Sequence, residues 1–187
     1  QLNLLAAVRS IVDLPEGVDV SEVGEINQKT DWSEFVKTPE LIIHCAARVH
    51  VMNEKSNDPL QAFRDVNVAG TLNLAKQAAA AGVKRFIYIS SIKVNGEGTD
   101  INCKYTISDQ VAPEDPYGIS KHEAEQSLIE LSQETDMELV IIRPTLVYGP
   151  GVKGNFLNLL KLCKSGLPLP FGAIQNARSM VYLENLV

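Results

Sequence analysis

The feature that most limits what this chain can fold into is a regular alternation of strand-length apolar runs with helical patterns. Four runs are rich in branched residues and almost continuously apolar, at residues 3–9, 41–46, 85–90 and 138–143. Such runs are typical of parallel strands that are buried on both faces of a sheet. The order of strands and helices predicts an α/β fold, an open Rossmann-like parallel sheet with helices on both faces.

Two helix starts are marked by an aspartate followed by a proline. Asp58 and Pro59 predict an N-cap and a first helical position, and the helical pattern then continues to Gly82 as the C-cap. A second helix is expected to start near Asp115 and Pro116.

Length and charge narrow the class of partner. The chain has 187 residues, 45% of them hydrophobic, which suits one globular domain or one domain plus part of another. A net charge of -6 without a basic stripe argues against a nucleic-acid or anionic-membrane partner. No apolar run approaches the roughly 18 residues of a membrane span. We therefore expect a cytoplasmic protein that binds a small molecule.

Cysteine and histidine residues give no metal signal. The cysteines are odd in number and widely spaced, and none forms a zinc-like pair with another cysteine or a histidine. This usage indicates a reducing compartment. Structural roles are predicted for the histidines, and no metal site is expected; the residues concerned are Cys45, Cys103, Cys163, His44, His50 and His122.

A literal G-x-G-x-x-G pattern occurs at Gly149, Gly151 and Gly154. In a dinucleotide site such a turn leads into a helix, a second strand and an acid about 20 residues on. Here we expect one short helix and then a turn-like segment, with no second strand and no well-placed acid. Pro150 also removes a backbone donor. The pattern is therefore interpreted as a chance match in a loop at the carboxyl edge of the sheet.

The candidate chemistry lies in the segment DPYGISKHEAEQ. Tyr117 and Lys121 are four residues apart near a helix start, so their side chains share one face. A tyrosine titrates near pH ~10, and lowering its pKa by roughly three requires about 4 kcal/mol. Two nearby cations, a lysine ammonium and a positively charged nicotinamide, could supply that stabilisation.

Two serines end the third apolar run, where a parallel sheet presents side chains to a ligand. Ser91 could donate a hydrogen bond to a substrate hydroxyl or a developing oxyanion. For Ser90 we favour a purely structural role at the end of the strand.

These motifs resemble the extended short-chain dehydrogenases/reductases, in the nucleotide-sugar epimerase and dehydratase branch. The resemblance covers essentially the whole chain, because LIIHCAARVHV, DVNVAGTLNL, GVKRFIYISSIKVNG, DPYGISKHEAE, VIIRPTLVYGPG and NARSMVYLENLV follow in the order and spacing of the family. It implies an NAD(P)-binding Rossmann-like domain over residues 1–150 and the start of a substrate-binding region over residues 151–187. It also implies that the first strand, its glycine-rich turn and the rest of the substrate-binding region lie outside this sequence.

The resemblance assigns roles to individual residues. Tyr117 would be the general base, Lys121 would bind the nicotinamide ribose and lower the tyrosine pKa, and Ser91 would hold the reacting hydroxyl. Contacts to the NAD or NADP cofactor are expected from seven residues, Arg9, Ala46, Ala47, Asn67, Tyr117, Lys121 and Pro144. Contacts to a nucleotide-diphosphate sugar are expected from Ser91, Asn155 and Arg178.

Structural alternatives stand beside three of these roles. Asn67 can also bond neighbouring backbone from within a helix, which is compatible with a place close to the cofactor. Asn155 either touches the sugar nucleotide or caps the last helix, and capping is favoured. Arg178 either binds the diphosphate or is a solvated surface residue.

The departures from the family pattern bear on the reaction. Ile92 and Lys93 stand where dehydratases of this branch carry an acid pair, so the dehydration chemistry is not expected. Asn95 replaces a tyrosine that is common in the family, and Ser179 replaces a common aspartate. The identity of the sugar substrate is therefore left open.

The leading hypothesis is an NAD(P)-dependent nucleotide-sugar 4-epimerase of UDP-hexose type, which works through a 4-keto intermediate as a homodimer. The alternative is a 4-ketoreductase or dehydrogenase that uses NADP(H), because Arg9 stands where it could accommodate a 2'-phosphate. A noncatalytic binding protein on the same fold is a third possibility. The joint presence of Ser91, Tyr117 and Lys121 argues against it.

Overall fold

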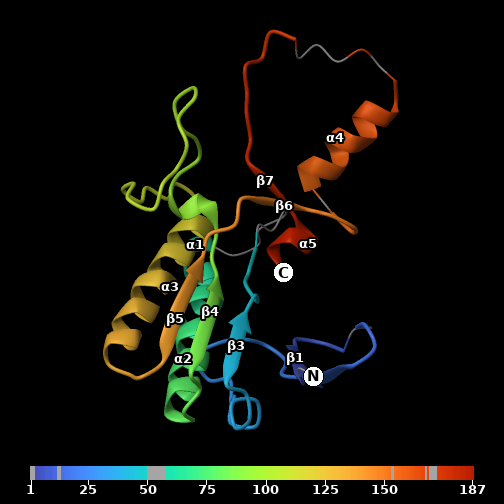
Figure 1. Cartoon of the computed structure of the whole chain (residues 1–187). Coiled ribbons are helices and arrows are strands. Elements are labelled where there is room, and N and C mark those ends of the chain that lie inside the picture. The colour runs from blue at the N-terminus through green and yellow to red at the C-terminus, as the bar shows by residue number, and fades with distance from the viewer. Residues whose placement is uncertain (1–2, 12–13, 50–57, 153, 167, 169–171) are drawn as a thin grey trace. The chain divides into compact units, whose positions relative to one another are not determined.

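The computed structural model of this protein describes residues 3–11, 14–49, 58–152, 154–166, 168 and 172–187 (Figure 1). The chain divides into two compact units, Gln1–Arg143 and Pro144–Val187, and each is described by itself. The boundary at residue 150 between a cofactor domain and a substrate region stays a prediction about function.

A three-stranded parallel sheet in the order β3-β4-β5 forms the centre of the first unit. Its strands are β3 (Leu41–His44), β4 (Arg85–Ile89) and β5 (Glu138–Ile142). Near the N-terminus, β1 (Leu4–Val8) and β2 (Val18–Glu22) form a separate parallel pair. All four predicted strands are thus confirmed. The fifth strand of this unit, β2, was not predicted, because its charged residues interrupt the apolar pattern.

The helices of the first unit connect the strands of the central sheet. Between β3 and β4 the chain forms α1 (Pro59–Arg64), the π-helical segment η1 (Asp65–Gly70) and α2 (Thr71–Ala80). After β4 come the short 3-10 helix η2 (Ile92–Val94) and the long helix α3 (Pro116–Gln133).

Both predicted helix starts are confirmed by their caps. The Asp58 carboxylate accepts a hydrogen bond from the Gln61 amide at 3.1 Å, and Asp115 accepts one from the Gly118 amide at 2.6 Å. Gly82 follows α2 with a φ of 84°, the left-handed conformation expected of a C-terminal glycine.

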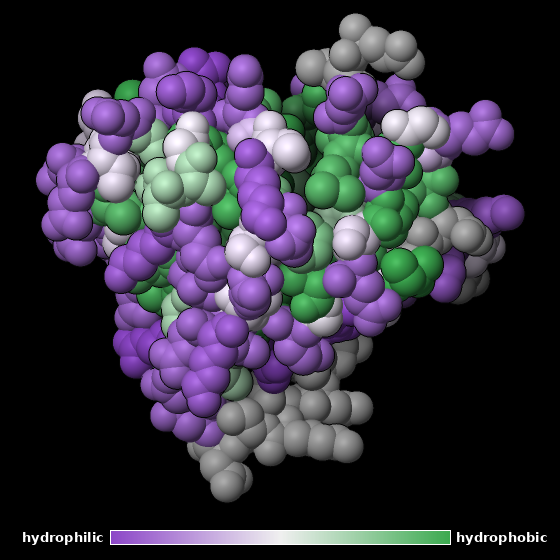
Figure 2. Space-filling model, turned by 90° about the horizontal axis from the view of Figure 1, so that it is seen from below, coloured by the Kyte–Doolittle hydropathy of each residue, from purple (hydrophilic) through white to green (hydrophobic). Residues whose placement is uncertain are grey.

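The prediction that the strands are buried on both faces is wrong in part. Leu5 of β1 and Ile43 of β3 are 45% and 55% exposed, and apolar side chains reach the surface in Figure 2. In the central sheet, the strand order explains why one face is exposed. Right-handed crossovers between strands that follow each other in order place α2 and α3 on the same face, and only that face is packed.

The core of the first unit lies between this face of the sheet and the helices. Aromatic side chains of β4 are fully buried, with Phe86 and Tyr88 both at 0% exposure. The surrounding cluster comes from the segment before β3, from α2 and α3, and from the residues that follow these helices, and consists of Trp32, Val36, Leu74, Ala75, Ala78, Val83, Ala124, Leu128, Leu131 and Met137.

The second unit contains a parallel pair of short strands, β6 (Leu146–Tyr148) and β7 (Met180–Tyr182). Between them lies α4 (Gly154–Lys164), and α5 (Leu183–Leu186) follows β7. The predicted helix after the glycine pattern is confirmed. The prediction that no second strand follows it is wrong, because β7 pairs with β6. A strand of three residues is too short to give a recognisable sequence pattern.

Among the described residues, no helix is long and apolar enough to cross a membrane.

Candidate active site

The carboxyl end of β4 places the two serines differently. The Ser90 amide donates to the Ile142 carbonyl at 2.7 Å, and its side chain is buried. This geometry agrees with a structural role for Ser90. Ser91 has extended backbone, with φ -156° and ψ 147°, and opens η2 by accepting a hydrogen bond from the Lys93 amide at 3.3 Å. Its hydroxyl is half-buried at the edge of the sheet.

Tyr117 lies in the first turn of α3, close enough to Ser91 for the serine hydroxyl to influence the pKa of Tyr117. Burial has the largest influence on the pKa of Tyr117 and raises it, while Ser91 and Lys93 act in the opposite direction. The family resemblance predicts that Lys121 lowers this pKa, but Lys121 is not among the groups that shift the pKa of Tyr117 here. A lower pKa of Tyr117 therefore depends on the other cation predicted to lie nearby, a positively charged nicotinamide.

Lys121 is held elsewhere, which explains this difference. Its ammonium donates to the Ile89 carbonyl at 2.7 Å and lies 4.0 Å from the centre of the Tyr88 ring. The residue is only 1% exposed, and burial lowers the pKa of Lys121 to about 8 against the opposing influence of Glu125 and Cys45. One carbonyl uses one of three ammonium donors, so the side chain can bind further hydroxyl groups.

Asn67 joins this site to the chain segment after β3. Its carboxamide oxygen accepts from the Arg48 amide at 2.7 Å, and its nitrogen donates to the Arg48 carbonyl at 3.0 Å and the Ser120 hydroxyl at 2.9 Å. The expected bonding to neighbouring backbone is corrected, since Arg48 is 19 residues away. Asn67 fixes the segment after β3, which contains Ala46 and Ala47, against the residue that precedes Lys121.

Lys93 connects the segment after Ser91 with the start of α3. Its ammonium lies 2.6 Å from a carboxylate oxygen of Asp115 and 2.6 Å from one of Glu97. Because Asp115 also caps α3, this ion pair links Ser91 and Tyr117 through only a few residues. Lys93 therefore has a structural role here. Dehydratases of this branch carry an acid at this position.

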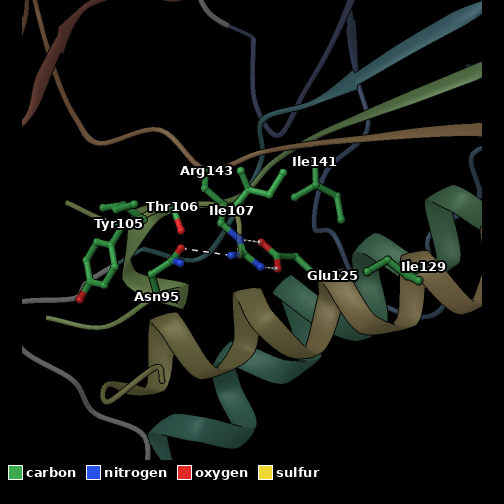
Figure 3. A pocket seen from close by; sticks show the side chains of 9 residues that line it. Asn95, Tyr105, Thr106, Ile107, Glu125, Ile129, Ile141 and Arg143 are labelled. Carbon is green, nitrogen blue, oxygen red and sulfur yellow. Dashed lines mark hydrogen bonds and ion pairs between the residues drawn. The ribbon is translucent and has the colours of Figure 1, made fainter. Parts of the chain in front are cut away.

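A buried ion pair supports α3 one turn beyond Lys121 (Figure 3). The guanidinium of Arg143 binds Glu125 through two hydrogen bonds of 2.9 and 2.6 Å and donates to the carboxamide oxygen of Asn95 at 3.1 Å. Arg143 follows β5, Glu125 belongs to α3 and Asn95 follows η2. One side chain thus joins the three segments that carry the candidate chemistry.

This ion pair lines a cavity of about 370 Å³ beside α3. Ser91, Tyr117 and Lys121 are not part of its wall, which is made by Ile92, Asn95, Tyr105, Thr106, Ile107, Glu125, Ile129, Ile141 and Arg143. Glu125 and Arg143 are not among the site residues predicted from the sequence. The available signal was a glutamate one helical turn after Lys121, which shares its helix face.

Two of the three histidines lie among the described residues. His44 is buried, hydrogen-bonds the Thr71 hydroxyl at 3.0 Å, and has its pKa lowered to about 3, chiefly by burial. His122 lies on α3 with its ring 4.0 Å from a Glu125 oxygen. His50 is outside the described residues. Within the part of the chain that the structure describes, no cluster of three metal-ligating side chains occurs.

The other predicted cofactor residues of the first unit lie at strand ends. Arg9 directly follows β1 and is exposed, and Ala46 and Ala47 follow β3. Because β3 and β4 are parallel neighbours, their carboxyl ends lie at the same edge of the sheet. Small side chains after β3, a buried Ser90 oxygen without a partner among the described residues, and spare donors on Lys121 fit a nicotinamide nucleotide at this edge.

The second unit carries the remaining predicted residues on exposed segments. Asn155 is the second residue of α4, so it does not occupy the expected N-cap position. Arg178 is exposed in the segment before β7, and Pro144 precedes β6. Gly151 and Gly154 have φ of 80° and 66°, and a Cβ at Gly149 would lie 3.1 Å from the Leu183 side chain. The glycine pattern thus serves a tight turn and a close packing contact.

Parallel strands with crossover helices, and a Ser91, Tyr117 and Lys121 cluster at their carboxyl edge, define a Rossmann-like protein of the short-chain dehydrogenase/reductase type. Residues 9–187 match the model of the NAD dependent epimerase/dehydratase family. The chain belongs to this family.

Two relatives and one solved structure illustrate the similarity. The chain is 56% identical to a UDP-glucose 4-epimerase of Vibrio cholerae, over 97% of this chain and 56% of that protein. It is 32% identical to the N-acetyl-alpha-D-glucosaminyl-diphospho-ditrans,octacis-undecaprenol 4-epimerase of Escherichia coli O157:H7, over 90% of this chain and 50% of that protein. The structure of the UDP-glucuronic acid 4-epimerase from Bacillus cereus in complex with NAD has a TM-score of 0.76 and 23% identity, covering 92% of this chain and 54% of that one. The chain therefore spans about half the length of the curated relatives it matches.

Proposed function

We propose that this chain carries the catalytic part of an NAD-dependent nucleotide-sugar 4-epimerase that acts on a UDP-hexose. The observation that carries the proposal is the placement of Tyr117 on α3 beside Ser91, which lowers the pKa of Tyr117, with the ammonium of Lys121 from the same helix bound at the end of β4. The similarity to a UDP-glucose 4-epimerase of Vibrio cholerae supports the choice of a UDP-hexose.

Each residue has a defined task in this proposal. Ser91 holds the C4 hydroxyl of the sugar by a hydrogen bond, and Tyr117 takes the proton from that hydroxyl. Lys121 binds ribose hydroxyls with its spare donors. A nicotinamide cofactor would be held by Lys121, Ala46, Ala47 and Pro144, with Asn67 positioning the segment after β3, and it would supply a hydride acceptor and donor together with a positive charge. The 4-keto sugar then presents its other face, so that C4 would take back the hydride on that face while Tyr117 returns the proton to the C4 oxygen.

Recognition of the sugar nucleotide is assigned to the second unit. Arg178 is proposed to bind the diphosphate, because its guanidinium can contact two phosphate oxygens at once. Asn155 is proposed to contact the sugar nucleotide, since its position inside α4 leaves it without a capping function.

A 4-ketoreductase that uses NADP(H) is the second candidate. Arg9 favours it, because this exposed residue directly follows β1 and an arginine there can bind a 2'-phosphate. Mass spectrometry of the nucleotide released from the denatured full-length protein separates the two. Retained NAD supports the epimerase, whereas NADP or no nucleotide supports the reductase. If the purified protein binds a UDP-hexose and neither converts nor reduces it, the noncatalytic alternative holds.

We further propose a cytoplasmic homodimer. Support for the compartment comes from the cysteines, since the three described ones are all free thiols. Support for the dimer is a shallow groove of about 140 Å³ on α2 and α3 that is lined by both apolar and charged side chains, including Leu72, Lys76 and Glu130. Light scattering of the full-length protein tests the dimer, and a monomeric mass at micromolar concentration would contradict it.

A further inference from the structure

The surroundings of Lys121 contain an aromatic contact that the proposed chemistry does not use. The Lys121 ammonium lies 4.0 Å from the centre of the Tyr88 ring while it donates to the carbonyl of Ile89, the next residue of β4. Tyr88 is 0% exposed and belongs to the core cluster. Packing in the core therefore fixes the ring independently of its contact with the ammonium.

An ammonium at this depth needs compensation. Burial disfavours the charged form of a lysine, and it has this effect on Lys121. The attraction between a cation and an aromatic face favours the charged form, and it is strongest where both groups are withdrawn from water. The Ile89 carbonyl satisfies only one donor of the Lys121 ammonium. The Tyr88 ring is the second group that favours the charged form of Lys121.

The other groups that face Lys121 do not replace the ring. Glu125 favours the charged amine from α3, but its carboxylate is shared with Arg143 through two hydrogen bonds. Cys45, at the end of β3, has its own thiol pKa raised by burial, so it is neutral near pH 7. The pKa of His44 is lowered to about 3, which keeps this ring uncharged as well.

We propose that Tyr88 is a positioning residue for Lys121, because its buried ring keeps the ammonium charged and held at the carboxyl end of β4. The effect of Tyr88 on cofactor binding rests on the proposed function, in which Lys121 binds the nicotinamide ribose. The effect on the charge of Lys121 does not.

The test uses full-length protein with 13C-labelled lysine and follows the ε-methylene resonance of Lys121 by NMR as a function of pH. The resonance is assigned by its loss in Lys121→Arg. We expect Tyr88→Phe to keep the pKa of Lys121 and Tyr88→Leu to lower it by about one pH unit, the size of a desolvated cation–π contact. Phe86→Leu is the matched control, since it shortens an equally buried ring of β4 and should leave the pKa unchanged. An unchanged pKa in folded Tyr88→Leu would overturn the proposal.

A measurement on the unmodified protein covers the case in which Tyr88→Leu does not fold. Protons above an aromatic face resonate upfield, so the ε-methylene of Lys121 should lie upfield of the other lysines. A resonance at the ordinary position would equally overturn the proposal.

Calorimetry with NAD separates this proposal from the proposed function. The Lys121 pKa is lower in Tyr88→Leu, so both proteins carry the charge near pH 6 and differ above the lowered pKa. The ratio of the two dissociation constants should therefore rise from about 1 near pH 6 to about 10 near pH 9, the fold-change that one pH unit of pKa difference implies. If the pKa falls while this ratio stays at 1, Tyr88 positions Lys121 as proposed, and the cofactor role of Lys121 is wrong.

Discussion

The two units of the chain differ in how they support their candidate functional residues. In the first unit, Ser91, Tyr117 and Lys121 lie on a strand end and a helix that pack on a buried core. In the second unit, none of the described side chains is buried, and Asn155 and Arg178 are exposed. Chemistry requires groups held to within a fraction of an ångström, which packed elements provide. The difference agrees with the proposal that turnover belongs to the first unit and substrate recognition to the second.

The largest effect should come from the proposed base. Tyr117→Phe removes the hydroxyl that transfers the proton and keeps the ring, so kcat should fall by about 10²- to 10⁴-fold while the fold is retained. Steady-state kinetics of the full-length protein and circular dichroism measure the two quantities. Activity above a few per cent in the folded variant would show that another group is the base.

A pair of truncations compares the stability of the two units directly. Phe86→Ala opens a cavity at a fully buried position and should cost about 3–5 kcal/mol of unfolding free energy. Leu160→Ala, at a position of α4 that is 47% exposed, should change it by less than about 0.5 kcal/mol. Urea denaturation of the full-length variants gives both values. Equal costs would mean that Leu160 is buried in the full-length protein and would remove the contrast.

The ion pair behind α3 should be the next most sensitive feature. Arg143→Met leaves Glu125 buried without its partner, which should destabilise the protein by about 3 kcal/mol, the low end for buried pairs because Arg143 keeps 27% of its side-chain surface. The double variant with Glu125→Met should recover much of this loss. A single variant as stable as the parent protein would show that the pair does not hold α3.

The glycine loop of the second unit should give a smaller effect than the ion pair. Gly151 has a φ of 80°, and a valine there is strained even though its side chain would meet no neighbour within 4 Å. Gly151→Val should weaken binding of a UDP-hexose by roughly tenfold, about 1.4 kcal/mol, and leave NAD binding nearly unchanged. Calorimetry of the two ligands distinguishes the alternatives. Lost NAD affinity with intact sugar binding would identify the loop as a dinucleotide turn.

The sequence was sufficient where a local signal exists. The apolar runs predicted β1, β3, β4 and β5, and the Asp-Pro pairs predicted the starts of α1 and α3. Short β7 has no such signal, so the interpretation of the glycine pattern relied on a missing strand that the structure contains. That interpretation now depends on the missing acid, on Pro150 and on the order of the motifs.

Tertiary contacts explain what could not be predicted at the site. Spacing placed Tyr117 and Lys121 on one helix face, but it could not show that the ammonium is bound by Ile89 and lies over Tyr88. It also could not show that Asn67 bonds Arg48 or that Arg143 reaches Glu125, because each pair joins segments that are distant in the sequence. Burial, which reverses the expected direction of the Tyr117 pKa, likewise arises only when the helix packs on the sheet.

The most direct test of the account is proton NMR of UDP-glucose incubated with the full-length protein in D2O. Removal and return of a hydride at C4 keeps the original hydrogen, so the account predicts the C4 epimer with protium at C4. The same sample with Tyr117→Phe should show no conversion. Deuterium at C4 of the epimer would demand a carbanion mechanism, and unchanged UDP-glucose with the active full-length protein would contradict the proposed substrate.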